Sequence, residues 1–250
     1  MQKTICLQCL MSCTSQKSVK SQSIVSNGAE IQLVSDIFSF TEGPAADRFG
    51  NVYFTDQPND KIYFWDWKTN KIEEFLDKTG RANGTFFDQK GNLLTCSDEN
   101  GEIWKINEDG VAEVLTTNFE GKRLNGPNDL WVDENNGIYF TDPLYVRDYW
   151  TDFKQEIQEK NLYYRNSEGK ITKLDTFTQP NGIVGGQKLK KLYVSDIDAN
   201  KTYVYDISYL FSNISLKILK ATAGSFVVPD FEITFTEKSL SPIYSINSFI

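Results

Sequence analysis

The sequence Gly-Ile-Tyr-Phe-Thr-Asp, residues 137–142, is an apolar strand that ends in a hydroxyl residue and an aspartate. Three similar stretches occur in the same chain: Tyr-Phe-Thr-Asp at 53–56, Thr-Cys-Ser-Asp at 95–98 and Tyr-Val-Ser-Asp at 193–196. In chain order, the four terminal aspartates lie 42, 44 and 54 residues apart, a spacing typical of propeller blades. The chain is therefore predicted to be an all-β protein of the β-propeller type, with four blades legible in its sequence.

The residues around each copy repeat as well. A polar segment suited to a tight turn precedes three of the strands, at residues 47–51, 88–92 and 133–137, where Gly or Asn can adopt positive φ. A second strand follows three of the copies, at 61–66, 102–107 and 201–206. Each unit is thus an antiparallel meander, and stacking such sheets would bury the apolar face that one sheet alone leaves uncovered.

The pattern divides the chain into a leader at 1–27, blades at 28–207 and a divergent C-terminal tail at 208–250. After Asp206 there is a single glycine, Gly224, and no further strand ending in Ser-Asp or Thr-Asp. A closed propeller of this blade size needs more chain than the tail offers, so an open or incomplete ring is expected. A separate irregularity, a long insertion between Pro143 and Asn161, is interpreted either as a functional surface flap or as a simple excursion.

The N-terminal residues have the character of a targeting segment. Lys3 precedes a short apolar stretch at 5–11, and Leu-Met-Ser-Cys at 10–13 is similar to a bacterial lipoprotein cleavage box with Cys13 as the lipidated residue. If this leader is a signal, the protein is exported and periplasmic or anchored to the outer membrane of a bacterium; a plain disordered leader would leave it cytoplasmic. No other run approaches the length of a membrane-spanning helix, and Cys6-x-x-Cys9 lacks the second pair expected of a zinc site.

The composition restricts the chemistry. The chain of 250 residues has 34 acidic residues against 26 basic ones, a balance that repels phosphate backbones and disfavours a nucleic-acid partner. It contains no histidine, which excludes a Ser-His-Asp triad and every His-ligated metal site. Any catalysis must therefore use carboxylates, amides, Lys, Tyr, Cys or an oxygen-ligated metal.

Three short motifs precede the inner strands of blades and supply such oxygens. They are Thr-Glu-Gly-Pro at 41–44, Leu-Asn-Gly-Pro-Asn-Asp-Leu at 124–130 and Gln-Pro-Asn-Gly-Ile at 179–183; Arg123 and Asn83 lie in related positions. Oxygen donors that converge on a propeller axis suit a hard cation such as Ca²⁺ or Mg²⁺. The alternative for the asparagines is a purely structural role in tight turns. The Ser-Asp and Thr-Asp strand ends are interpreted as turn-capping residues.

In these motifs the sequence resembles the SMP-30/gluconolactonase/LRE-like family of six-bladed propellers over about residues 30–206. The resemblance implies hydrolysis of a small-molecule lactone or sugar ester with one divalent cation, Ca²⁺ being favoured over Mg²⁺ or Zn²⁺. It also implies metal ligation by Glu42, Asn128 and Asn181, and a location near the substrate for Arg123, Asp129 and Asn83. Four legible blades against the family's six indicate an incomplete or divergent C-terminal part.

One element of the family pattern, the aspartate that both ligates the metal and acts as general base, is not found. Asp230 is the nearest acid, in unrelated surroundings, so the catalytic residue is left unassigned and the activity is expected to be impaired. The alternatives are a non-catalytic propeller that binds a ligand or partner, and a truncated copy of an enzyme. A strictosidine-synthase-like propeller would need a base on another blade, and no residue indicates one.

Overall fold

The computed structural model describes residues 28, 30, 32–150 and 153–210, together with the strands at 213–223, 226–228 and 231–233. From Gln32 onward these belong to one compact unit, which contains four four-stranded antiparallel sheets. The predicted leader with Cys13, and Asp230 in the tail, lie outside the described residues. The four sheets confirm the predicted all-β propeller with four blades.

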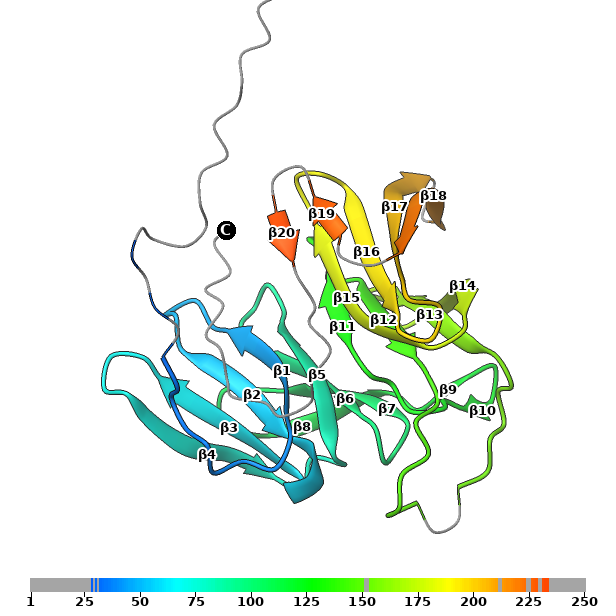
Figure 1. Ribbon diagram of the computed structural model, residues 1–250. Helices are drawn as coiled ribbons and strands as arrows, with labels where there is room; N and C mark the ends of the chain where they lie inside the picture. The colour runs from blue at the N-terminus through cyan, green and yellow to red at the C-terminus, as the bar shows by residue number, and fades with distance from the viewer. Residues whose placement is uncertain are drawn as a thin grey trace, which may run out of the picture. The chain divides into compact units, whose positions relative to one another are not determined.

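Each blade is a meander in which strands adjacent in sequence pair side by side (Figure 1). The first blade comprises β1 (Thr41–Ala46), β2 (Val52–Asp56), β3 (Lys61–Asp66) and β4 (Lys71–Asp77), with the short 3₁₀ helix η1 (Gln57–Asn59) after β2. The second comprises β5 (Ala82–Phe87), β6 (Leu93–Ser97), β7 (Glu102–Ile106) and β8 (Ala112–Thr116). The third comprises β11 (Leu130–Val132), β12 (Ile138–Asp142), β13 (Lys160–Arg165) and β14 (Ile171–Phe177).

The fourth blade comprises β15 (Pro180–Gly186), β16 (Lys191–Asp196), β17 (Lys201–Leu210) and β18 (Asn213–Ala223). Because β17 continues to Leu210 and pairs along its length with β18, the boundary predicted at residue 207 falls inside a strand. Two small hairpins complete the described strands: β9 (Asn118–Phe119) with β10 (Lys122–Arg123), and β19 (Phe226–Val228) with β20 (Phe231–Ile233).

The turns between the first two strands of a blade use the same chemistry. The Asp47 carboxylate accepts hydrogen bonds from the main-chain N–H groups of Phe49 and Asn51, at 2.8 and 2.9 Å. Asp88 and Asp133 make the equivalent bonds in the second and third blades. The aspartate thus closes the turn and fixes the register of the hairpin. The tight turns themselves lie where the sequence repeat predicted them.

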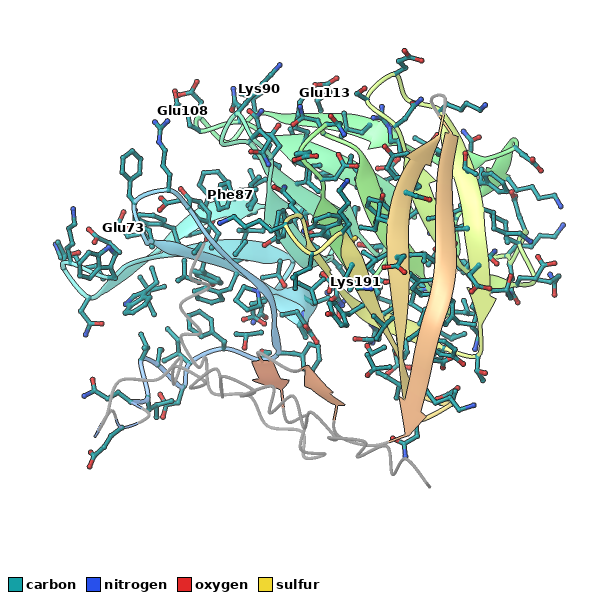
Figure 2. All side chains as sticks on the ribbon, turned by 90° about the horizontal axis from the view of Figure 1, so that it is seen from above. Glu73, Phe87, Lys90, Glu108, Glu113 and Lys191 are labelled. Carbon is teal, nitrogen blue, oxygen red and sulfur yellow. The ribbon has the colours of Figure 1, made fainter. Side chains whose placement is uncertain are left out.

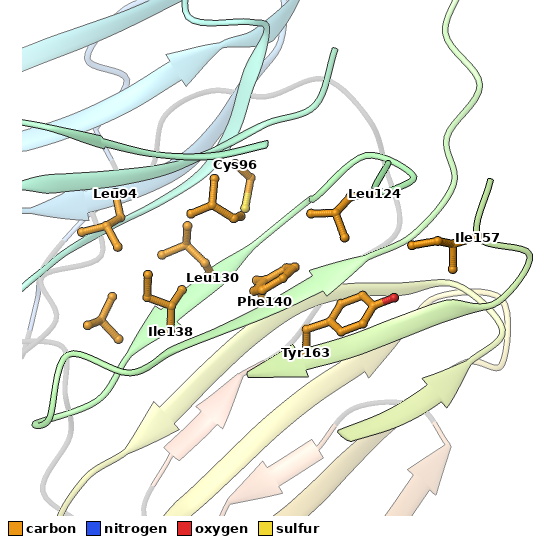
Figure 3. Packing of buried hydrophobic residues seen from close by; sticks show 10 residues of the cluster. Leu94, Cys96, Leu124, Leu130, Ile138, Phe140, Ile157 and Tyr163 are labelled. Atoms are coloured by element: carbon orange, nitrogen blue, oxygen red, sulfur yellow. The ribbon is translucent and has the colours of Figure 1, made fainter. Parts of the chain in front are cut away.

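The core lies between successive blades because alternate side chains of a strand point to opposite faces of its sheet. In β12, Ile138 and Phe140 pack with the second blade, whereas Tyr139 packs with the fourth. Cys96 is fully buried in the cluster between the second and third blades (Figure 3), where it packs as a small apolar side chain. Each interior blade therefore has two buried faces, the arrangement that defines a propeller.

Charged side chains occupy the outer strands and turns. Glu73, Glu108 and Glu113 are exposed and point away from the packed sheets (Figure 2). Within the described part of the chain, no helix is long and apolar enough to cross a membrane.

Candidate metal and substrate site

The inner strands of successive blades approach each other closely at the three motifs. A Cβ atom added to Gly43 of β1 would lie 2.4 Å from the carbonyl oxygen of Asn83, and one added to Gly84 of β5 would lie 2.4 Å from Oδ1 of Asp129. The Gly84 N–H also donates to the Asn128 carbonyl oxygen at 2.7 Å. Glycine is required at these two positions because a side chain would force the blades apart.

Threonines from the second strand of a blade join the inner strands across the blade boundary. Thr55 Oγ1 donates to the Asn83 carbonyl oxygen in the next blade at 3.0 Å. Thr141 Oγ1 donates to the Asn181 carbonyl oxygen, again in the next blade, at 2.7 Å. The hydroxyl residues of the repeated strand ends therefore place the motifs of neighbouring blades beside one another.

We call Glu42, Asn83, Asn128, Asn181 and Asp129 the inner-strand cluster. The first four lie at matching places, since 42, 83 and 128 each precede the turn aspartate of their blade by five residues. Their side chains come from, or directly precede, β1, β5, β11 and β15. The cluster thus contains the three predicted metal ligands and two of the three residues predicted near the substrate.

The oxygens of the cluster are largely uncommitted. Asn83 and Asn128 are 3% and 6% exposed, and their side chains form no hydrogen bond with any residue that the structure describes. Asn181 donates its Nδ2 to the Tyr145 hydroxyl at 3.0 Å, which leaves its amide oxygen free to accept. Burial raises the pKa of Glu42, while a hydrogen bond from the Gly43 N–H and the charge of Arg147 oppose the increase. None of the unpaired cluster atoms is among the described side-chain atoms that are fully buried without a partner, so they remain accessible to a ligand.

Asp129 has a different environment. Its Oδ1 accepts from the Leu130 N–H and its Oδ2 accepts from the Ile183 N–H, both at 2.9 Å. Burial raises its pKa to about 7; the two main-chain bonds oppose this increase and the charge of Glu42 adds to it. Because both carboxylate oxygens are occupied, Asp129 connects β11 to β15 and supports the cluster from within the protein.

The donor set fits a hard divalent cation. Among the residues that the structure describes, no three His, Cys, Asp or Glu side chains gather as a metal cluster, so a cation here would bind one carboxylate, Glu42, and neutral amide oxygens. Calcium accepts such mixed oxygen sites, and its affinity falls as the number of charged ligands falls. The described residues would therefore form a weak cation site.

Arg123 has partners within the protein. Its Nη1 donates to the Leu124 carbonyl at 2.7 Å, its Nη2 donates to the Glu99 carbonyl at 2.7 Å, and its guanidinium lies 5.0 Å from the Phe153 ring centroid. These contacts stabilise the loop before β11 and give Arg123 a structural role. Its predicted contact with substrate stays a prediction.

The strand-end aspartates mostly cap main-chain segments, as the sequence predicted. Asp56 accepts from the Phe40 N–H, and Asp196 accepts from the Gln179 N–H. Asp142 accepts from the N–H groups of Asn125 and Gly126, at 3.0 and 2.9 Å, and burial raises its pKa to about 7. Each of these carboxylates fixes the chain just before the inner strand of its own blade.

The insertion after β12 brings side chains to the cluster that the motif analysis did not assign. Tyr145 binds Asn181, as described above, and Arg147 lies 5.2 Å from the centroid of the Tyr145 ring. Figure 1 shows the insertion as the long connection between β12 and β13. The sequence indicates the insertion through the spacing of 54 residues between Asp142 and Asp196. This spacing does not specify which residues the insertion contacts.

Four successive blades, with oxygen donors at equivalent places of their inner strands, define a β-propeller with a candidate cation site. The chain belongs to the SMP-30/Gluconolactonase/LRE-like family, whose model matches residues 40–224. This match extends past residue 206, into the segment that the sequence analysis had assigned to a divergent tail.

The proteins and solved structures that are similar to this chain include gluconolactonases. A gluconolactonase from Zymomonas mobilis is 25% identical over 199 residues, which cover 72% of this chain and 55% of the relative. A diisopropyl-fluorophosphatase from Loligo vulgaris is 27% identical over 66% of this chain and 59% of the relative. The chain thus spans a little over half the length of these curated relatives. The solved structure of a gluconolactonase from Xanthomonas campestris, 23% identical, has the same fold with a TM-score of 0.69 over 79% of this chain and 66% of that structure.

Proposed function

We propose that this protein is a metal-dependent hydrolase of a sugar lactone or a related ester. The observation that carries the proposal is the inner-strand cluster, which combines the Glu42 carboxylate with the side-chain amides of Asn83 and Asn128, unpaired among the described residues, and with the Asn181 amide oxygen, whose Nδ2 is bound to Tyr145. The family of the chain and its gluconolactonase relative support the substrate class.

Glu42, Asn128 and Asn181 would hold one divalent cation, and Ca²⁺ is favoured because all the donors are oxygens. When bound, the cation would polarise the lactone carbonyl as a Lewis acid. Glu42 supplies the negative charge of the site, and Tyr145 orients the Asn181 amide by accepting its N–H. Asp129 fixes the spacing between the third and fourth blades through its bond to Ile183.

Hydrolysis itself requires a base. Water adds to the carbonyl carbon, the ring C–O bond breaks, and the ring oxygen takes up a proton, so that the product is a hydroxy acid. A proton must leave the attacking water, and such base catalysis is worth roughly 10²- to 10⁴-fold. The predicted stand-in, Asp230, lies outside the described residues, and a slow reaction is expected if no better base exists.

The test uses the full chain, freed of metal with a chelator. Calorimetric titration with Ca²⁺ should show one site, and Ca²⁺ should restore hydrolysis of glucono-1,5-lactone. Glu42→Gln and Asn181→Ala should weaken Ca²⁺ binding at least 10-fold while retaining the fold, whereas Glu168→Gln, in an exposed turn, should behave as the unmodified protein. Hydrolysis that persists unchanged after chelation would show that the metal mechanism is wrong. Diisopropyl fluorophosphate should be tested as a second substrate, because one relative of the chain is a diisopropyl-fluorophosphatase.

A second candidate is a cation-binding propeller without hydrolytic activity. It is favoured by the two hydrogen bonds that the Asp129 carboxylate accepts from main-chain N–H groups, which give this acid a structural role between the third and fourth blades. A protein that binds one Ca²⁺ and hydrolyses no lactone would support this candidate.

We also propose that Cys13 carries a lipid anchor and that the protein is exported. The support is the Leu-Met-Ser-Cys sequence at 10–13 after a short apolar stretch. Labelling with a fatty-acid analogue in a bacterial host should mark the full chain and not the Cys13→Ser variant. Equal labelling of the two would refute the anchor.

A further inference from the structure

Asp98 differs from the other three strand-end aspartates. Asp56, Asp142 and Asp196 accept from main-chain N–H groups just before their own blades. Asp98 instead receives three side-chain donors on a single oxygen, Oδ2: Gln57 Nε2 at 2.9 Å, Arg147 Nε at 3.2 Å and Tyr149 Oη at 2.9 Å. It is 2% exposed.

Another residue performs the capping role in the second blade. Asp60, which follows η1, accepts at Oδ1 from the N–H groups of Thr79 and Arg81, at 2.9 and 2.6 Å. These are the residues just before β5, the place that the strand-end aspartate caps in the other blades. Because Asp60 caps the residues before β5, the Asp98 carboxylate is available to bind side chains of the insertion.

The insertion is thereby held over the inner-strand cluster. Asp98 binds Arg147 and Tyr149, and the Tyr149 ring lies 4.0 Å from the Arg81 guanidinium carbon. Arg147 also lies over the ring of Tyr145, which accepts the hydrogen bond from Asn181. Its charge reaches Glu42, where it lowers the carboxyl pKa against the effect of burial. Arg147 therefore contacts Tyr145, the hydrogen-bond partner of Asn181, and its charge acts on Glu42.

Both terminal nitrogens of Arg147 lack a protein partner among the described residues, whereas Arg81 uses Nη1 and Arg123 uses both terminal nitrogens. Arg81 and Arg123 donate from their terminal nitrogens to main-chain carbonyls. Arg147 donates only from Nε, and its side chain is 26% exposed. Its Nη1 and Nη2 groups form no hydrogen bond with any residue in the described ranges, so both remain available to a ligand.

We propose that Arg147, fixed by Asp98, is a specificity-determining residue that donates Nη1 and Nη2 to hydroxyl oxygens of a polyhydroxylated lactone. The inference rests on the proposed function, and it assigns recognition of the substrate hydroxyls to the insertion. A guanidinium with one nitrogen anchored presents its remaining donors in a fixed plane. It therefore recognises an oxygen-rich ring without ordering a flexible side chain at each binding event.

The test compares two lactones with the full chain in the presence of Ca²⁺. Arg147→Ala should lower kcat/KM for glucono-1,5-lactone 10- to 100-fold, mainly through KM, and leave δ-valerolactone, which has no hydroxyl groups, within about twofold. Arg147→Lys should restore part of the loss, and Asp98→Asn should give an intermediate loss. Arg48→Ala is the matched control, since this guanidinium packs only on the neighbouring Phe49 ring.

A binding measurement separates failure of this inference from failure of the proposed function. If the unmodified protein hydrolyses neither lactone, the proposed function fails, and binding of the non-hydrolysable gluconolactam is measured by titration instead. Tighter binding to the unmodified protein than to Arg147→Ala would support the inference. Equal gluconolactam binding, or an equal loss of activity on both lactones, would overturn it.

Discussion

The carboxylate of Asp129 accepts a hydrogen bond from the main-chain N–H of Ile183 at 2.9 Å, so a side chain of the third blade binds the inner strand of the fourth. Asp129→Ala removes this acceptor and the acceptor for the Leu130 N–H. Leaving buried donors unpaired costs about 1 to 3 kcal/mol each, so the free energy of unfolding should fall by about 2 to 4 kcal/mol in urea denaturation.

Asp129→Asn is the comparison for that variant. Its amide oxygen can still accept one of the two N–H groups, and it carries no buried charge, so the loss should be clearly smaller than for alanine. Equal losses in the two variants would show that the hydrogen bonds contribute little to the contact between these blades.

A methyl group at Gly84 should separate the second and third blades. Its Cβ would lie 2.4 Å from Asp129 Oδ1 and 2.7 Å from the Asn128 carbonyl oxygen, and overpacking of this kind costs about 1 to 3 kcal/mol. Gly84→Ala should lower the melting temperature and weaken Ca²⁺ binding together. Gly186→Ala is the control, because the nearest atom to its Cβ is at an ordinary 3.5 Å; similar melting temperatures for the two variants would contradict the prediction.

Thr141 contributes a hydroxyl bond between the third and fourth blades. Thr141→Val keeps the shape of the side chain and removes the bond to the Asn181 carbonyl and the weaker bonds with the Asp129 main chain, so the free energy of unfolding should fall by about 1 to 2 kcal/mol. Thr172→Val, at an exposed position of β14, should have almost no effect. The idea fails if both valine variants unfold at the same urea concentration.

The stability should depend on pH through Asp142. Burial raises the folded-state pKa of this carboxyl from 3.8 to about 7, so the folded protein binds more protons than the unfolded chain between these values. Stability should therefore fall as pH rises through 7, by about 1 kcal/mol per such group between pH 6 and pH 8. Asp142→Asn should reduce this pH dependence, although it loses one main-chain bond. Urea denaturation at the two pH values measures the effect, and an unchanged pH dependence in the variant would exclude Asp142 as its source.

Much of the fold follows from local sequence. The turn aspartates Asp47, Asp88 and Asp133 recur with the blade spacing, and their hydrogen bonds stay within one turn. The strand-end hydroxyls recur as well, but those of Thr55 and Thr141 bond to the next blade. The sequence could predict the inner-strand motifs for the same reason, since each lies at a set distance from a turn that can be recognised.

The rest depends on contacts that leave no local pattern. Asp60 takes over capping from Asp98, and nothing near either residue distinguishes them in sequence. The path of the insertion is fixed by Arg147 and Tyr149 binding a carboxylate 49 and 51 residues away. The fourth blade continues through β18, but after Asp206 the sequence has a single glycine and no further strand ending in Ser-Asp or Thr-Asp, which is why residue 207 was predicted as a boundary.

The bonds between inner strands connect residues that are synthesised one blade apart. Thr55 precedes its partner Asn83 by 28 residues in the sequence, and Thr141 precedes its partner Asn181 by 40 residues. Since domains are made from the N-terminus and repeats fold against their neighbours, the Glu42 carboxylate can reach its final place before the Asn181 amide has left the ribosome. The order of translation is then also the order in which the proposed ligands become available, so a ribosome-bound chain that ends before Asn181 should bind Ca²⁺ more weakly than the full chain.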